Sequence, residues 1–149
     1  MPWLGAAVFF VKLGGMNARW LVIAGAVLAG VGVALGAFGA HGLDERLRQL
    51  GHEASLDKRL AWYETAVRYQ IYHALAILVI AGLAGQLPAS RGMNAAASSM
   101  IVGIALFSGS LYAMTFAGDA WRKLGMVTPV GGLAFIVGWV LVVVAAWRR

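Results

Sequence analysis

The chain has 149 residues, of which 61% are hydrophobic and only 12% are charged, and its mean hydropathy is +0.79. A soluble domain carries roughly a quarter of its residues as charged side chains, so this composition excludes an ordinary soluble protein and indicates one membrane domain. The formal net charge is +6. Because the basic residues mostly flank apolar blocks, we expect them to meet lipid head groups and not nucleic acid. Cysteine is absent, which excludes disulfides, thiolate metal sites and cysteine nucleophiles.

The first fifteen residues stand apart from the rest of the chain. They hold an apolar run of about ten residues, too short to span a bilayer, and they lack the basic start and small-residue cleavage site of a signal peptide. Met16 lies directly before the first long apolar block. We expect Met16 to be the true initiator, or residues 1–15 to be a dispensable interfacial tail.

Four apolar blocks have the length of membrane spans. They cover about residues 20–40, 63–85, 95–117 and 126–147, each near the ~20 residues that a transmembrane helix needs. Short polar turns at 86–94 and 118–125 join the later blocks, so neighbouring spans should pack antiparallel. We therefore predict an all-α membrane protein whose single domain, residues 16–149, is an antiparallel bundle of four transmembrane helices.

The connection between the first two spans, residues 41–62, has a pattern of its own. Leu43, Leu47 and Leu50 recur at the spacing of an amphipathic helix, and Gly51 is a suitable end for it. The spacing predicts a short helix lying at the membrane interface. A solvated charged loop is the alternative.

Small residues follow one stripe of the first span and recur in the fourth. In lipid, helices associate where small side chains let two backbones approach closely, so these residues predict tight helix packing. The stripe could face another span or a second subunit, and the sequence leaves that open. The predicted packing residues are Gly25, Ala29, Gly32, Gly36, Gly39, Gly131 and Gly138.

Polar side chains gather in one leaflet of the predicted bundle. If the spans alternate in direction, the ends of the first and third spans share a side with the starts of the second and fourth. Ionisable groups inside a membrane usually face the bundle interior or water, so we expect a water-accessible recess there. Its candidate residues are His41, Glu64, Arg68, Tyr69, Gln70, His73, Ser108, Ser110, Tyr112 and Thr128.

A purely structural interpretation of the same side chains stays open. Glu64 precedes Arg68 by four residues, the better order for an ion pair on a helix, and His73 would then be a hydrogen-bonded core histidine. His41 and His73 without carboxylate or thiolate support make a weak metal or haem site. The sequence therefore predicts no catalytic residue, no cofactor and no metal ligand.

The start of the fourth span has the pattern of a helix N-terminus. Thr128 is suited to the N-cap position and Pro129 to the first helical position. This pattern predicts that the fourth helix begins at Pro129.

Four motifs carry a family resemblance: "GAFGAHGL", "WYETAVRYQIYHALAIL", "LFSGSLY" and "LGMVTPVGGLAFIVGW". Together they resemble the small membrane proteins grouped as domain of unknown function 423, which include the bacterial YgdD type and the eukaryotic transmembrane protein 256 type. The likeness runs in unbroken order from Met16 to about Trp139. It implies four membrane helices and no established activity.

For function, the sequence favours a non-catalytic bundle that binds a partner protein or a lipid, within a membrane protein complex or a homo-oligomer. The alternative is a small-molecule or proton-handling protein that uses the polar recess. Basic residues are nearly balanced between the two sides of the membrane, and those on the side of the termini lack acidic neighbours. We therefore expect a multi-pass protein of the bacterial inner membrane with both termini in the cytoplasm.

Overall fold

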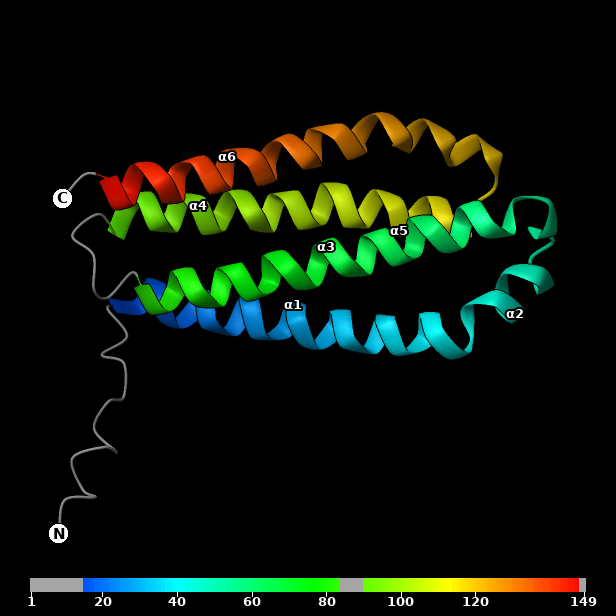
Figure 1. The fold of residues 1–149 in the computed structure, drawn as a ribbon, viewed down its shortest axis with the longest axis horizontal. Coiled ribbons are helices and arrows are strands. Elements are labelled where there is room, and N and C mark those ends of the chain that lie inside the picture. Colours follow the sequence, from blue (N-terminus) through cyan, green and yellow to red (C-terminus); the bar gives the residue numbers. More distant parts are fainter. Residues whose placement is uncertain (1–14, 84–89, 148–149) are drawn as a thin grey trace, which may run out of the picture.

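The computed structural model describes residues 15–83 and 90–147, and all of its regular elements in these ranges are helical. In chain order they are α1 (Gly15–His41), α2 (Leu43–Gln49), the 3-10 turn η3 (Glu53–Ser55), α3 (Leu56–Leu83), α4 (Ser90–Gly103), the π-helical segment η4 (Ile104–Ser108), α5 (Gly109–Phe116), the 3-10 segment η5 (Asp119–Met126) and α6 (Val127–Trp147). Figure 1 shows the long helices lying side by side, with α2 at one end.

Within these ranges, four helical stretches are long and apolar enough to cross a membrane. They are Ala18–His41, Glu53–Leu83, Arg91–Phe116 and Lys123–Trp147. The predicted all-α membrane fold with four spans is therefore confirmed. The expected N-terminal tail lies almost wholly outside the described residues, since α1 begins at Gly15.

The second span begins earlier than its apolar block suggested. Helix α3 starts at Leu56, seven residues before the expected Tyr63. Leu56, Arg59, Leu60 and Tyr63 recur at helical spacing and all turn at least partly inward, so this charged lead-in also has a buried stripe. It extends the helix by seven residues ahead of the apolar block.

The fourth span does not begin as expected at Pro129. Helix α6 starts at Val127, directly after η5, so Thr128 is already inside the helix and is not its N-cap. Its hydroxyl instead lies 2.7 Å from the hydroxyl of Ser110. Pro129 falls in the first turn of α6, where a missing N–H costs no helical hydrogen bond.

Helix α1 packs on α3 along its small-residue stripe. Gly25, Gly32 and Gly39 face α3 so closely that a Cβ at each would lie 2.7–2.9 Å from Leu78, Ile71 and Tyr63. Gly36 is looser, since its Cβ would lie 3.4 Å from Val67, and Ala29 is half-buried. The stripe predicted from the sequence thus lies against another span of the same chain.

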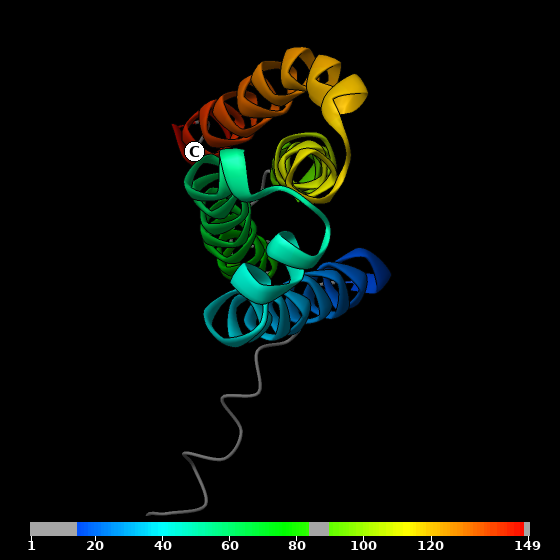
Figure 2. The same ribbon diagram turned by 90° about the vertical axis from the view of Figure 1, so that its right-hand side faces the viewer.

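Helix α6 packs on the third span in the same manner. A Cβ at Gly131 would overlap the main-chain nitrogen of Phe107, and one at Gly138 would lie 2.9 Å from Met100. In return, the ring of Phe135 lies over Gly103. The bundle therefore consists of the pair α1–α3 and the pair α6 with α4 and η4, joined through contacts of α3 with the third span (Figure 2).

Helix α2 is amphipathic, but its apolar side faces the protein. Leu43 and Leu47 are fully buried and pack with Tyr63 in one apolar cluster. Asp44, Glu45 and Arg48 face outward. The short interfacial helix thus closes one end of the bundle, and only Leu50 at its end remains exposed among its three leucines.

Candidate functional site

The polar side chains at the α2 end of the bundle are fixed by contacts between helices. Arg59, on the first turns of α3, is buried to 4% exposure. Its Nη1 donates to the carbonyls of Met114, Thr115 and Ala117 at 2.7–2.9 Å, and its Nε donates to the hydroxyl of Ser55. The last carbonyls of a helix have no main-chain donor, so Arg59 closes the end of the third span.

His52 completes this closure. Its Nε2 lies 3.3 Å from the carbonyl oxygen of Phe116, and a carbonyl can only accept, so the ring is the donor. The carbonyls of four successive residues, 114–117, thus receive side-chain donors from His52 and from Arg59 at the start of α3. Arg59 is not among the residues predicted for a site, and its helical spacing with Leu56, Leu60 and Tyr63 is the signal that could have identified it.

Tyr63 and Gln70 tie α3 to α1 through main-chain carbonyls. The hydroxyl of Tyr63 donates to the carbonyl of Leu35 at 2.8 Å, and the amide of Gln70 donates to that of Leu28 at 2.8 Å. The carbonyl oxygen of Gln70 accepts from the hydroxyl of Tyr112 at 3.0 Å. Gln70 therefore connects three spans, and both ends of its buried amide have partners.

His73 lies deeper on α3 with both ring nitrogens engaged. Its Nδ1 is 2.8 Å from the carbonyl of Tyr69, which can only accept, so this nitrogen carries the proton. Its Nε2 is then free to accept from the indole N–H of Trp139, at 3.3 Å. The ring stacks on Phe135 with centroids 3.5 Å apart. His73 is therefore a hydrogen-bonded core histidine that joins α3 to α6.

Two serines of the third span, Ser108 and Ser110, lie at the end of its π-helical segment. Ser110 donates to the carbonyl of Phe107 at 2.9 Å, and since a serine hydroxyl has one proton, Thr128 must be the donor of the Ser110–Thr128 bond. Ser108 is fully buried, and its hydroxyl has no partner among the described residues. Helix α6 meets the π segment here, at Gly131.

The remaining candidates lie on the outside. His41 is exposed at the end of α1. Arg68 donates to Glu64 at 2.7 Å as the expected ion pair on one helix. Neither of the two packs into the bundle, since their side chains are 51% and 72% exposed. Such an exposed pair contributes little to stability.

Most of the ten candidates fall into separate groups. Gln70 with Tyr112, Ser110 with Thr128, and His73 with Trp139 form separate interior hydrogen bonds, while His41, Glu64 and Arg68 face outward. This arrangement differs from the single recess expected from the sequence. Trp139 is not among the predicted site residues, because it lies in an apolar part of the fourth span, far from the polar start of that span.

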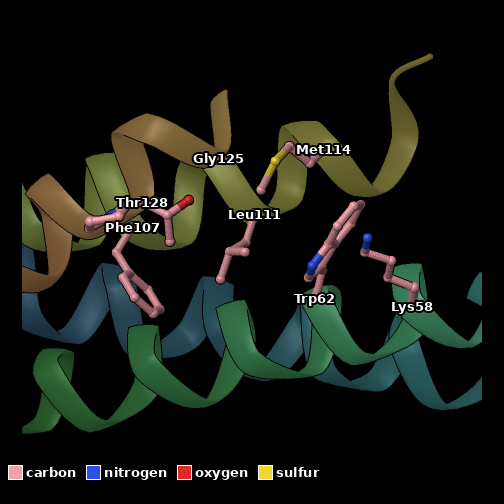
Figure 3. Close-up of a pocket in the computed structure, with 8 residues that line it drawn as sticks. Lys58, Trp62, Phe107, Leu111, Met114, Gly125 and Thr128 are labelled. Atoms are coloured by element: carbon pink, nitrogen blue, oxygen red, sulfur yellow. The ribbon is translucent and has the colours of Figure 1, made fainter. Parts of the chain in front are cut away.

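Two lateral grooves lie in this region. One of about 460 Å³ is lined by Lys58, Trp62, Phe107, Leu111, Met114, Gly125, Thr128 and Pro129. Figure 3 shows Lys58 and Trp62 rising from α3 opposite Phe107, Leu111 and Met114. A second, of about 650 Å³, is lined by Tyr69, His73, Phe107, Pro129, Gly132, Leu133, Phe135, Ile136 and Trp139. No group of three His, Asp or Glu side chains suited to a metal ion occurs in the part of the chain that the structure describes.

Comparison with known proteins places the chain in a family. Residues 35–132 match the model of the family described as protein of unknown function (DUF423). The chain belongs to the DUF423 family. The resemblance seen in the sequence motifs is thereby confirmed, and no solved structure matches the chain.

Individual relatives carry membrane names. The chain is 43% identical over 125 residues to the UPF0382 membrane protein YwdK of Bacillus subtilis, covering 84% of the chain and 94% of YwdK. It is 37% identical over 133 residues to the UPF0382 inner membrane protein YgdD of Escherichia coli, covering 89% and 93%. With its four apolar spans, this DUF423 protein is a multi-pass integral membrane protein.

Proposed function

We propose that this DUF423 protein is a non-catalytic membrane component that acts by binding a partner protein or a lipid within the bilayer, as an accessory subunit of a larger complex. The observation that supports it is that the interior polar side chains form hydrogen bonds that hold the helices together. Arg59, Gln70 and His73 each have their hydrogen-bonding groups engaged by main-chain carbonyls or side chains of other helices. Side chains committed to holding a fold are not available to act on a substrate.

The outward surface of the spans supports the same proposal. Helix α1 contacts mainly α3 and leaves large apolar side chains exposed along its other side, among them Trp20, Val27, Val31 and Val33. On α6, Leu133, Ile136 and Val143 are likewise exposed. Such a surface is suited to lipid chains or to the helices of a partner.

The alternative, a protein that handles a small polar molecule or protons in a recess, has less support. It needs polar groups that face a shared space and retain free donors or acceptors. His73 borders the larger groove, yet both of its ring nitrogens are engaged. Glu64 and Arg68 pair with each other on the outside.

Photo-crosslinking in native membranes tests the proposal. A photoreactive amino acid at exposed Val31 or Val137 should capture a defined protein or lipid, whereas one at buried Ile77 should capture neither, because that position contacts only its own chain. Purification in mild detergent should recover the same partner. A small polar molecule bound in stoichiometric amount, with no protein or lipid adduct from either exposed position, would overturn the proposal in favour of the alternative.

A further inference from the structure

The two grooves between α3 and α6 adjoin each other on the protein surface, and together they are called the channel below. They share the lining residues Phe107 and Pro129. The channel begins at Lys58 and Trp62 on α3 and ends at Trp139 on α6. It opens laterally because α6 packs chiefly on α4 and η4, and α3 chiefly on α1 and the third span.

The length of this channel suits one leaflet of a bilayer. Counting ~30 Å of hydrocarbon back from Leu83 at 1.5 Å per residue places the membrane boundary near Tyr63. Lys58 and Trp62 then lie at the level of the head groups. His73 lies fifteen residues beyond Lys58, or ~22 Å along the helix, so the far part of the channel reaches the middle of the hydrocarbon.

The walls of the channel are suited to a hydrocarbon chain. Leu111, Met114, Leu133 and Ile136 line it together with aromatic rings. Two of its polar groups are already paired, since Thr128 donates to Ser110 and His73 uses both ring nitrogens, and Tyr69 contributes mainly its ring, which stacks on Phe107. The deep part of the channel therefore has little to offer a polar ligand.

The mouth of the channel is basic. The ammonium of Lys58 lies 5.1 Å from the ring centroid of Trp62, and Lys58 has no carboxylate partner among the ion pairs of the described residues. Lys123 is also exposed, two residues before the lining residue Gly125. A lysine and a tryptophan at the membrane boundary, above an apolar channel, match a negatively charged head group above an acyl chain.

We propose that this channel is a binding site for an anionic phospholipid, with Lys58 at the phosphate and one acyl chain lying along Phe107, Leu133 and Ile136. The inference rests on the proposed function and names its lipid. Trp62 forms the wall at the level of the ester groups. Lys58 selects for a negatively charged head group. The apolar channel binds the acyl chain, and this contribution to the affinity is the same for lipids with any head group.

The test uses the purified full chain, loaded with equal amounts of phosphatidylglycerol and phosphatidylcholine and examined by native mass spectrometry. The wild type should retain phosphatidylglycerol in preference. Lys58→Gln should reduce that preference by roughly five-fold, the effect of one basic residue at an anionic surface. Arg46→Gln, at an exposed position on α2 outside the channel, should leave it unchanged.

A second pair of variants tests the acyl-chain part. Ile136→Trp fills the channel and should lower the retention of both lipids, whereas Val137→Trp, exposed but outside the channel lining, should not. Equal retention of the two lipids by the wild type, an equal effect of both charge variants, or an equal effect of both tryptophan variants would overturn the inference. Any of these results beside a crosslinked partner protein would leave the proposed function standing.

Discussion

Arg59 of the second span and Thr115 of the third span form reciprocal hydrogen bonds. The guanidinium of Arg59 donates to the carbonyl of Thr115 at 2.7 Å, and the hydroxyl of Thr115 lies 3.5 Å from the carbonyl of Arg59 in return. Both residues are buried. The charged first turns of α3 are thereby bound to the end of the third span.

Replacing Arg59 with methionine should destabilise the protein strongly. Methionine keeps much of the side-chain volume but leaves the carbonyls of Met114, Thr115 and Ala117 without their donor. Hydrogen bonds to a charged group contribute about 1.5–3 kcal/mol each, and they are not additive, so we expect a loss of about 3 kcal/mol. Reversible unfolding in mixed micelles measures it.

Arg46→Met provides the matched control, because Arg46 is exposed on α2. It should change the unfolding free energy by no more than ~0.5 kcal/mol. Similar losses for the two variants would show that the contacts of Arg59 contribute nothing beyond its charge.

Adding one methyl group at Gly131 should disrupt the packing of α6, whereas adding one at Gly30 should not. Both glycines lie within membrane helices. A Cβ at Gly131 meets the main chain of Phe107, which cannot move aside, while a Cβ at Gly30 meets nothing within 4 Å. We expect Gly131→Ala to cost about 3 kcal/mol, the upper part of the range for overpacking, and Gly30→Ala to change stability little.

Thermal denaturation followed by gel filtration checks this pair, with monodisperse protein as the readout. Equal recovery of both variants would mean that α6 does not approach the π segment as closely as the structure has it. Gly36→Ala is a useful third variant, because its Cβ would make an ordinary contact with Val67.

The fold followed from the sequence because membrane spans are read from length and polarity alone. Lipid offers no hydrogen bonds, so apolar blocks of sufficient length must be helices, and small residues mark where two such helices meet. The end of each helix was harder to place. Helix α3 already begins at Leu56, among charged residues, because the inward-facing stripe of Leu56, Leu60 and Tyr63 is enough to pack this part of the helix against the protein.

The sequence predicted which end of the bundle holds the polar residues, but it did not predict their hydrogen-bond partners. That Gln70 and Tyr112 share one leaflet follows from the order of the spans. That Gln70 bonds to Tyr112 and to the carbonyl of Leu28 depends on how the helices are rotated, and a one-residue rotation changes every partner. The contact of Trp139 with His73 also depends on the rotation of the helices, and Trp139 lies in a part of α6 with no polar neighbour in the sequence.

The bond between Gln70 and Tyr112 should show measurable coupling. Gln70→Leu leaves the hydroxyl of Tyr112 without its acceptor, and Tyr112→Phe leaves the amide oxygen without its donor. Each single variant should lose about 1–3 kcal/mol, the cost of an unsatisfied buried group. The double variant should lose about 1 kcal/mol less than the sum of the two. Strict additivity would indicate that the two side chains do not interact.

Access of water to the polar leaflet can be measured with single cysteines, because the chain contains no cysteine of its own. Single cysteines at positions 41 and 64 should react with a charged, membrane-impermeant thiol reagent added from the α2 side, because His41 and Glu64 are exposed at that end. Cysteines at positions 70 and 108 should stay unreacted, because Gln70 and Ser108 are 4% and 0% exposed. Position 77, in the apolar core, gives the background rate.

Mass spectrometry of the intact protein measures the fraction of labelled molecules for each variant. Labelling at 70 and 108 at the rate seen at 41 would establish a water-filled recess there. It would mean that Gln70, Ser108 and their neighbours serve a ligand as well as the fold.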